Sequence, residues 1–385
     1  MKKILFISTR YPFPIFGGDK LRAFDILKVL SKKNRVNLVC LGKKNIIKNK
    51  NLSFCKNIKV FHLNFLSRII NTLLSLIKLE PLQNGFYLSK KMKDYINSTQ
   101  GDYDSIVCHM LRSSQYLPDN FIGEKILEST DLLSSNYHQT TKLLSIFNPF
   151  KYIYFIENFL IRKYEKKVFK KFNKIVFVSN KDATKAKKMI DKKKIYIIGN
   201  AKENISKLFK HKKSNNKIIF VGNIKYLPNK LACNSFAKNI LKIINLTYPN
   251  IKFHIIGDIG YFHNFFLSRY KNVIIHGKVQ NLKKVVQNSI CGLCNVKIST
   301  GFQNKILTYM SYGIPSIISN DSFINTKFKK NKDVIVFKNT KELINKIFYL
   351  IENKNFSNNI SSNSYKIIRK QYNLNNVLSK YNDII

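Results

Sequence analysis

Short apolar segments alternate with longer segments of helical periodicity along the whole chain. Apolar runs this short, with few polar positions inside them, are typical of strands buried on both faces of a parallel sheet. Segments such as residues 19–32 and 161–172 have the period expected of the helices that connect such strands. In the first half of the chain the predicted strands are residues 4–8, 36–40, 58–61, 105–109, 126–127, 175–179 and 195–198.

A polar, lysine-rich connection over residues 201–216 interrupts this alternation. The pattern then restarts, and the predicted strands of the second half are residues 217–223, 253–257, 273–277, 291–295, 316–319 and 334–337. The whole pattern predicts an α/β protein with two doubly wound, Rossmann-like domains over residues 1–204 and 205–368. Residues 369–385 are helical in pattern, and we expect this helix to cross back onto the first domain.

The length of 385 residues exceeds the size at which a single core usually keeps growing, and a hydrophobic fraction of 44% supplies apolar side chains for two. No window of about 18 residues is both apolar and uncharged, and the N-terminal apolar run is too short for a signal peptide. We therefore expect a cytoplasmic protein, with peripheral attachment to the inner face of the cytoplasmic membrane left open.

The chain carries 68 Lys and Arg against 21 Asp and Glu, a formal net charge of +47. Such a charge ordinarily indicates nucleic acid or an anionic membrane as a partner. The excess is mostly lysine and accompanies heavy use of Asn and Ile, as in proteins from AT-rich genomes. Because no nucleic-acid motif accompanies it, we expect no nucleic-acid partner, whereas attraction to an anionic membrane surface remains an expectation.

Four of the six cysteines lie in predicted strands, where a reduced thiol behaves as a small apolar group. Cys291 and Cys294 have the spacing of zinc and redox sites, but no second Cys or His pair follows at metal-site spacing. The sequence therefore predicts no metal site and no bound cofactor.

The first candidate site follows the first predicted strand, where Gly17, Gly18 and Asp19 open a helix. A glycine pair lets the backbone approach a ligand closely, and the helix N-terminus offers unpaired N–H groups to an anion such as a sugar diphosphate. The segment lacks a full dinucleotide-binding fingerprint. An ordinary strand-to-helix loop with Asp19 as the N-cap is an equal alternative.

The second candidate site follows the strand over residues 291–296. A turn leads into a helix that carries Gln303, Asn304, Lys305 and Thr308, and Asn304 and Thr308 share one face. This helix N-terminus and the charge of Lys305 suit a diphosphate. A plain crossover helix that ends at a glycine is the alternative.

Residues 300–318, TGFQNKILTYMSYGIPSII, resemble the donor-binding motif of GT-B glycosyltransferases of family 4. The resemblance is greatest to a bacterial branch whose motif runs roughly G-T-G-x-Q-N-K-x-x-E-A-M-A-x-G-x-P. Residues 14–22 resemble the P-x-x-G-G-D-K-x-R loop of the same branch, and residues 220–229 resemble its second-domain opening, F-x-G-x-x-x-Y-x-P-N.

The resemblance implies a GT-B fold, in which the two parallel sheets face each other across a cleft. It further implies retaining transfer of a hexose-type sugar from a nucleotide diphosphate sugar to a glycan or lipid-linked acceptor in surface-polysaccharide or lipopolysaccharide synthesis, without a metal. The catalytic residues that it suggests are His109, Lys305 and Asp19. The donor-binding residues are Gly17, Gly18, Gly222, Asn223, Val279, Thr300, Gly301, Gln303, Asn304, Lys305 and Thr308. The acceptor-side residues are Lys20, Arg22, Arg112, Asp131 and Tyr137.

Two residues depart from the family pattern, because Thr300 and Thr308 stand where relatives commonly carry glutamates. A carboxylate accepts charge-assisted hydrogen bonds from a ribose diol, whereas a threonine hydroxyl accepts only weaker neutral ones. Loss of the charged partner would weaken donor binding by about 1.5–3 kcal/mol. A catalytically impaired GT-B protein that acts as a binding partner or regulator is therefore the alternative function.

Residues 65–78 and 147–154 are apolar and basic. This composition is typical of helices that lie at a membrane interface, but the interpretation as buried core helices is slightly favoured.

Overall fold

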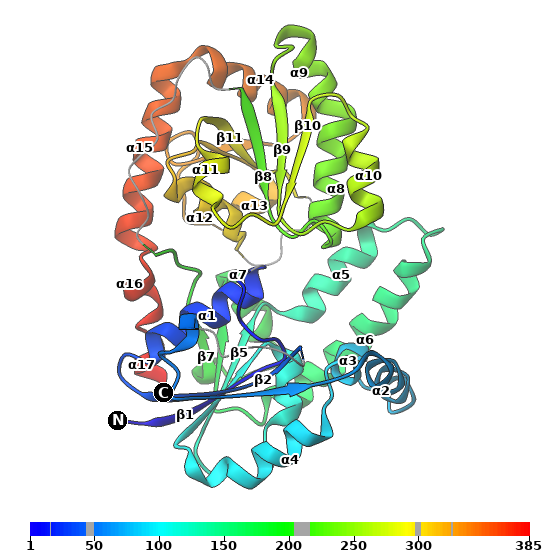
Figure 1. Ribbon diagram of the computed structural model, residues 1–385, viewed down its shortest axis with the longest axis vertical. Coiled ribbons are helices and arrows are strands. Elements are labelled where there is room, and N and C mark those ends of the chain that lie inside the picture. The colour runs from blue at the N-terminus through cyan, green and yellow to red at the C-terminus, as the bar shows by residue number, and fades with distance from the viewer. Residues whose placement is uncertain (16, 44–49, 204–215, 297–301, 325) are drawn as a thin grey trace. The chain divides into compact units, whose positions relative to one another are not determined.

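The computed structural model describes residues 1–15, 17–43, 50–203, 216–296, 302–324 and 326–385. The chain forms two compact units, each of them an α/β layer structure (Figure 1). The first unit comprises Met1–Gly199 together with Leu378–Ile385, and the second comprises Asn200–Val377.

The first unit contains a sheet of seven parallel strands in the order β3-β2-β1-β4-β5-β6-β7. The central strand β1 (Lys3–Ser8) pairs with β2 and β4, and its residues Ile4–Ile7 are completely buried. The order reverses at β1, as in doubly wound folds, where ligands collect at the carboxyl ends of the strands. The other strands are β2 (Arg35–Gly42), β3 (Asn57–His62), β4 (Ser105–His109), β5 (Glu124–Thr130), β6 (Lys174–Phe177) and β7 (Ile195–Ile197).

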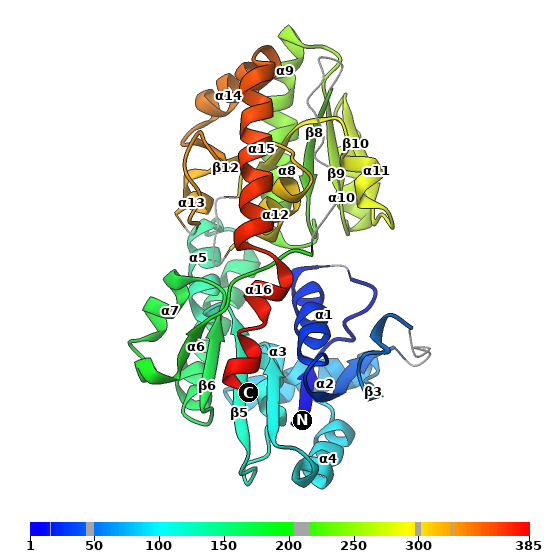
Figure 2. The same ribbon diagram turned by 90° about the vertical axis from the view of Figure 1, so that its left-hand side faces the viewer.

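Helices cover both faces of this sheet (Figure 2). The α-helices are α1 (Gly18–Leu30), α2 (Phe65–Ile77), α3 (Leu82–Phe86), α4 (Lys90–Thr99), α5 (Leu133–Leu143), α6 (Pro149–Phe169), α7 (Asn180–Ala186) and α17 (Tyr381–Ile384). Short 3-10 helices span Lys50–Leu52, Gln100–Asp102, Leu111–Tyr116 and Lys192–Lys194.

The C-terminal residues belong to the first unit, where α17 contacts α1. Tyr381 is fully buried, and the carbonyl of Ile384 accepts a hydrogen bond from Lys174 Nζ at 2.8 Å. The last residues of the chain therefore complete the structure of its first unit.

The second unit contains a sheet of six parallel strands in the order β10-β9-β8-β11-β12-β13. The strands are β8 (Lys217–Val221), β9 (Lys252–Ile256), β10 (Val273–Gly277), β11 (Ser289–Cys294), β12 (Ser316–Ser319) and β13 (Ile335–Phe337). The helices are α8 (Leu227–Ser235), a π-helix (Phe236–Ile240), α9 (Leu241–Thr247), α10 (Tyr261–Ser268), α11 (Leu282–Val286), α12 (Asn304–Ser311), α13 (Asn320–Phe323), α14 (Thr340–Glu352) and α15 (Lys354–Gln371). Helix α16 (Leu374–Leu378) leads back to the first unit.

The expectation of two Rossmann-like units with parallel sheets is confirmed, and the predicted strands match the observed ones closely. Cys291 and Cys294 are buried free thiols in β11, where burial raises the pKa of both. Among the helices of the described residues, none combines the length and the apolar character needed to cross a membrane.

The core interpretation of residues 65–78 and 147–154 is wrong. In α2 the apolar side chains are the exposed ones: Phe65 is 72% and Ile77 is 77% exposed, whereas Ser75 is buried. Helix α6 and the loop before it follow the same pattern, with Phe147 89% exposed and Glu157 buried.

Candidate functional site

In the second unit, three neighbouring strands end at glycines whose backbones pack against one another. Gly222 follows β8 and donates its N–H to Ile256 O at 2.9 Å, and Gly257 donates to Gly277 O at 2.8 Å. A Cβ atom on Gly257 would lie 1.8 Å from Gly222 O, so no larger residue fits at that position. Glycines at these positions let the three backbones approach closely at the carboxyl edge of the sheet, where ligands bind in such folds.

Lys305, in the first turn of α12, is a buried cation with neutral partners. Its Nζ donates to Asn229 Oδ1 at 2.9 Å and to Gln303 Oε1 at 3.1 Å, and it lies 4.9 Å from the ring centre of Phe220. Burial lowers the pKa of this ammonium group. Among the described residues no carboxylate lies within ion-pair distance of Lys305, so its charge is available to an anionic ligand.

Asn229 joins Lys305 to the loop that follows β8. Its Nδ2 donates to Asn223 O at 2.8 Å, while its Oδ1 accepts from Lys305. The predicted donor-binding residues Asn223, Gln303 and Lys305 therefore belong to one hydrogen-bonded cluster. Gly222 lies beside it, since a Cβ atom there would meet Asn229 Nδ2 at 3.1 Å.

The remaining predicted donor-binding residues of this unit have other surroundings. Thr308 is buried, and its hydroxyl donates to Asn304 O at 3.1 Å, a bond within its own helix. Val279 is a half-buried apolar residue that packs against the small apolar cluster to which Tyr309 belongs. Within the described residues no side chain caps the N-terminus of α12, and the N–H of Ile306 donates to Gln303 O at 3.0 Å. The N–H groups at the very start of the helix therefore point to where a ligand could accept from them. Thr300 and Gly301 lie outside the described residues.

Two further lysines of the second unit pair with one carboxylate. Asp258, directly after Gly257, lies 3.1 Å from Lys225 Nζ and 3.1 Å from Lys278 Nζ. Although partial burial opposes ionisation, these two ammonium groups hold the pKa of Asp258 below its usual value. The three residues follow β8, β9 and β10, so they lie at the same edge as the glycines.

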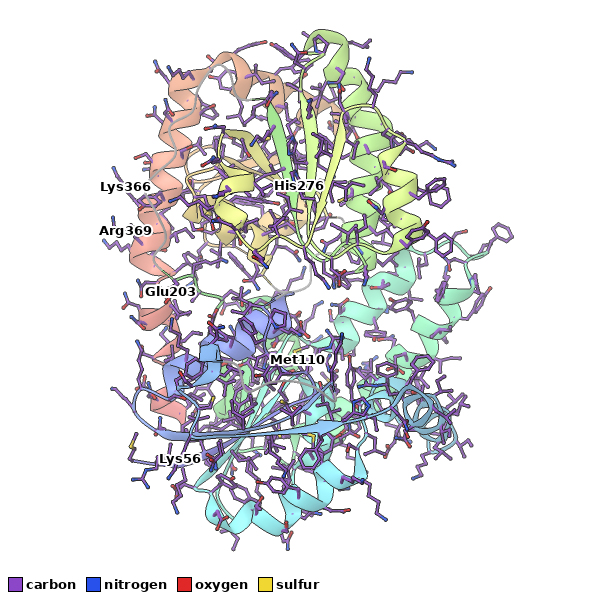
Figure 3. All side chains as sticks on the ribbon, in the orientation of Figure 1. Lys56, Met110, Glu203, His276, Lys366 and Arg369 are labelled. Carbon is purple, nitrogen blue, oxygen red and sulfur yellow. The ribbon has the colours of Figure 1, made fainter. Side chains whose placement is uncertain are left out.

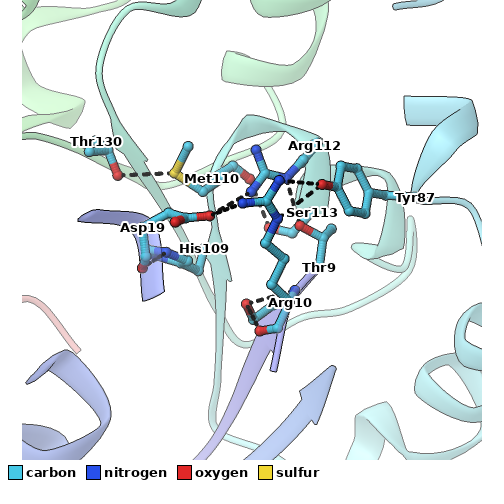
Figure 4. A network of polar contacts seen from close by, with 10 residues as sticks. Thr9, Arg10, Asp19, Tyr87, His109, Met110, Arg112, Ser113 and Thr130 are labelled. Atoms are coloured by element: carbon cyan, nitrogen blue, oxygen red, sulfur yellow. Dashed lines mark hydrogen bonds and ion pairs between the residues drawn. The ribbon is translucent and has the colours of Figure 1, made fainter. Parts of the chain in front are cut away.

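In the first unit, Asp19 is the centre of a polar network at the carboxyl end of the sheet (Figure 4). Its Oδ2 accepts from Arg10 at 3.0 Å and from Arg112 at 3.3 Å. Burial opposes ionisation of Asp19, but the two guanidinium groups keep its pKa below the usual value. Tyr87 Oη accepts from Arg10 at 2.7 Å, and the Arg112 guanidinium lies 4.8 Å from the centre of the same ring.

His109, at the end of β4, holds the backbone of Asp19 in place. The ring is buried and lies 5.8 Å from the ring of Phe6, and its Nε2–H donates to Asp19 O at 3.0 Å. Burial lowers the pKa of His109 to about 4, so the ring is neutral at pH 7. In this structure His109 positions Asp19, and a direct role in catalysis stays a prediction.

The backbone next to this network adopts a conformation that few residues accept. Met110, which follows β4 and is labelled in Figure 3, has a φ of 71°. Thr130, the last residue of the neighbouring strand β5, has a φ of 67°. Thr130 Oγ1 donates to Met110 Sδ at 3.4 Å, which joins the two positions. Left-handed conformations of such residues concentrate at functional sites.

Gly17 and Gly18 begin α1 as predicted. Gly17 is the N-cap and has a φ of 100°, a conformation that a side chain would strain. The interpretation of Asp19 as the N-cap is wrong, because Asp19 lies in the first turn and its carboxylate binds the two arginines.

The predicted acceptor-side residues lie in three different surroundings. Arg112 and Lys20 lie near the Asp19 network, since Arg112 binds Asp19 and Lys20 follows it on α1. Arg22 is buried in another network, where its Nε donates to Glu128 at 2.6 Å and its terminal nitrogens to Ile198 O and Gly199 O.

Asp131 and Tyr137 lie at the carboxyl end of β5 and on α5. Burial and the neighbouring carboxylates of Asp182 and Glu128 raise the pKa of Asp131 to about 7, although Arg22 opposes this shift. The ring of Tyr137 packs against Tyr154, with 5.2 Å between the ring centres.

A cavity of about 730 Å³ opens beside the Asp19 network. Its basic lining residues are Arg10, Lys20, Lys43, His62 and Arg68, and its aromatic ones are Tyr11, Phe13, Phe65, Phe86 and Tyr87. The volume falls within the usual range of small-molecule sites.

The sequence did not single out Arg10, Tyr87, Arg68 or Asp258 as site residues. Arg10 and Asp258 follow strands closely, so the rule that ligands bind at the carboxyl ends of strands could have found them. Tyr87 and Arg68 come from the loop after α3 and from α2, and nothing in the local sequence connects them to β1. Within the described ranges, no cluster of three or more His, Cys, Asp or Glu side chains is arranged to hold a metal ion.

Comparisons with known proteins match parts of this chain to a family model and to a curated relative. Residues 215–353, most of the second unit, match the family model described as glycosyl transferases group 1. A protein of the cps region of Klebsiella pneumoniae, described as an uncharacterized 44.6 kDa protein, is 25% identical over 263 residues, which cover 65% of this chain and 62% of that protein. The match thus spans less than two thirds of that relative.

Solved structures are similar over nearly the whole chain. HepE from Anabaena, in complex with UDP and glucose, is 13% identical with a TM-score of 0.70, and the match covers 100% of this chain and 99% of that one. WaaG, a glycosyltransferase involved in lipopolysaccharide biosynthesis, is 12% identical with a TM-score of 0.69 and 99% coverage of both chains. These similarities show that the chain has the GT-B fold.

Proposed function

We propose that this protein is a glycosyltransferase that moves a sugar from a nucleotide diphosphate sugar to a glycan or glycolipid acceptor in cell-surface polysaccharide synthesis. The match over residues 215–353 and the GT-B fold support transfer of a sugar. The similarity to a protein of a cps region and to WaaG supports the polysaccharide context. Retention of anomeric configuration, a family 4 affiliation and independence of metal ions are further parts of the proposal, and they rest on the motif resemblance.

The observation that carries the proposal is the buried ammonium group of Lys305. A buried cation without a carboxylate partner is costly, and a bound anion would compensate that cost. The N-terminus of α12, which no side chain of the described residues caps, adds its positive dipole end at the same place. The leaving diphosphate gains charge in the transition state, so the two features together would stabilise it.

We assign the acceptor to the first unit, where the cavity adjoins Asp19. The carboxylate of Asp19 stays ionised and is held rigidly by Arg10 and Arg112. It can accept a hydrogen bond from an acceptor hydroxyl and so orient it.

The membrane surface is the proposed location of the enzyme. The exposed apolar residues of α2 and α6 need a cover in an aqueous environment. Residues 63–79 contain no acidic residue, and neither do residues 132–156, whereas Arg68, Lys78, Lys142 and Lys151 lie within these segments. An apolar face accompanied by positive charge alone suits an anionic lipid bilayer.

A Lys305→Met variant tests the donor site. We expect UDP, GDP or ADP sugars to raise the melting temperature of the unmodified chain, because a ligand that binds only the folded state stabilises it. The variant should bind the same ligand at least tenfold more weakly, as hydrogen bonds to charged groups contribute about 1.5–3 kcal/mol. Lys230→Met, an exposed lysine on α8, is the matched control and should bind normally. Binding of none of these ligands to the unmodified chain would contradict the proposal.

Thr308 supports the second candidate, a catalytically impaired protein that acts as a binding partner or regulator. Its hydroxyl donates within the helix, so a ribose diol would find no carboxylate there. A Thr308→Glu variant distinguishes the two functions in a transfer assay. An active enzyme should change mainly in its KM for the donor, whereas an impaired protein should show no transfer before or after the substitution.

A further inference from the structure

The described residues that line the cavity of the first unit include several cations and no carboxylate. Of its sixteen lining residues four are Lys or Arg and one is His, and none is Asp or Glu. Asp19 compensates part of the charge of Arg10 from outside the lining. Such a cavity favours an anionic ligand over a neutral sugar.

Arg68 is a cation of this cavity that no carboxylate of the described residues compensates. Its Nε donates to Leu63 O at 3.3 Å and one terminal nitrogen donates to Phe86 O at 3.2 Å. Its guanidinium lies 4.9 Å from the ring centre of Phe86, and no carboxylate of the described residues pairs with it. A half-buried guanidinium with free donor capacity is well suited to bind phosphate.

Helix α2 connects this cavity with the apolar surface. Its polar residues face the protein: Asn71 Nδ2 donates to Leu88 O at 3.0 Å, and a Cβ atom on Gly85 would lie 2.2 Å from Asn71 O. The opposite face exposes Leu66, Ile69, Ile70, Leu73, Leu74 and Ile77. Phe65, at the start of the helix, lines the cavity and is also exposed, so it belongs to both surfaces.

We infer that this cavity binds a phosphate group carried by an amphiphile, whose phosphate lies between Arg10, Lys20 and Arg68 while its hydrocarbon chain continues along the exposed face of α2. This inference rests on the proposed function in one respect, which is that the amphiphile carries the acceptor hydroxyl. The cations would neutralise the phosphate, and Phe65 would mark the passage from the polar cavity to the hydrocarbon. The acceptor class is then a phospholipid-like or lipid-phosphate-linked molecule.

Isothermal titration of the full chain with n-decyl phosphate, below its micelle concentration and without nucleotide sugar, tests this inference. We expect n-decyl phosphate to bind at least tenfold more tightly than both inorganic phosphate and n-decyl maltoside. Arg68→Gln should reduce the affinity at least tenfold, and Arg68→Lys should restore part of it. Lys20→Gln, at the cavity wall, provides a second variant in case Arg68→Gln disturbs the packing on Phe86. Arg35→Gln, an exposed arginine at the other end of the sheet, is the control and should bind normally.

Three results would overturn the inference. Equal affinity for n-decyl maltoside would show a purely apolar site, and equal affinity for inorganic phosphate would show that the hydrocarbon contributes nothing. Unchanged affinity in both folded variants would place the phosphate elsewhere. The titration contains no nucleotide sugar, so its result is independent of the nucleotide-binding test. If the chain binds the amphiphile but no nucleotide, the proposed function alone is contradicted. If it binds a nucleotide but not the amphiphile, this inference alone is contradicted.

Discussion

At the scale of single residues, the carboxyl group of Asp131 has a pKa well above its ordinary value. The pKa of Asp131 is raised to about 7, first by burial and then by the carboxylates of Asp182 and Glu128. Its folded-state pKa lies above the unfolded value of about 3.9, so the folded state binds more protons between these two pH values. Asp131 therefore reduces stability progressively as pH rises from about 4 to 7.

An Asp131→Asn variant should remove this dependence. We expect it to unfold at a higher temperature than the unmodified chain at pH 8, by an amount equivalent to at least about 1 kcal/mol, because one pKa unit corresponds to about 1.4 kcal/mol. The difference should shrink as pH falls and vanish near pH 4. Asp102→Asn, an exposed carboxyl of the same unit, serves as the control. A difference that does not change with pH would show that Asp131 acts through packing.

The sequence located several of the polar residues that meet near the strand ends, but it did not reveal their contacts. Gln303, Lys305 and Asn223 follow strands and do form one cluster, because parallel strands bring their carboxyl ends to one edge. Arg22 follows the glycine loop just as closely, yet its side chain points into the buried network of Glu128. Position along the chain predicts the edge, whereas side-chain direction depends on packing partners far away in the sequence.

At the scale of elements, periodicity predicted the helices better than the faces they bury. The apolar positions of α2 suggested a core helix, because apolar stripes usually face the protein. Here Asn71 and Ser75 face α3 instead, and close approach to Gly85 requires small or polar groups on that side. Sequence alone does not tell whether an apolar helix face meets lipid or the protein core, since both kinds of face have the same period.

Two substitutions on the exposed face of α2 test its role at a membrane. Leu73→Ser and Ile77→Ser, combined, should reduce binding to phosphatidylglycerol vesicles at least tenfold, because each apolar side chain contributes about 1.5–3 kcal/mol when it is fully buried. Sedimentation with vesicles measures the change. Stability in urea should stay nearly constant, since both side chains are exposed.

The matched control is Leu246→Ser, an apolar residue of α9 that is 80% exposed. This substitution removes a leucine of similar exposure from the other unit and should leave vesicle binding unchanged. Equal loss in both variants would indicate a general effect of hydrophobicity, and no loss in the α2 variant would exclude this helix as the membrane contact.

At the scale of the whole molecule, the C-terminal segment of the chain binds to a buried ion pair of the first unit. Arg22 and Glu128 are 3% and 0% exposed in their side chains, and Tyr381 hydrogen-bonds to both. Burial raises the pKa of Glu128, while the guanidinium of Arg22 opposes that shift. A buried carboxylate of this kind depends on its partner, because an uncompensated charge in the interior is strongly unfavourable.

Arg22→Met should therefore destabilise the first unit by about 3–5 kcal/mol, the usual cost of leaving one member of a buried pair unpaired. Urea unfolding followed by hydrogen exchange should assign this loss to residues 1–199 and leave the second unit unchanged. The double variant Arg22→Met, Glu128→Gln should recover much of the loss, since it removes the orphaned charge as well. If the double variant were as unstable as Arg22→Met, the hydrogen bonds of Arg22 to Ile198 O and Gly199 O, and not the ion pair, would be the main contribution.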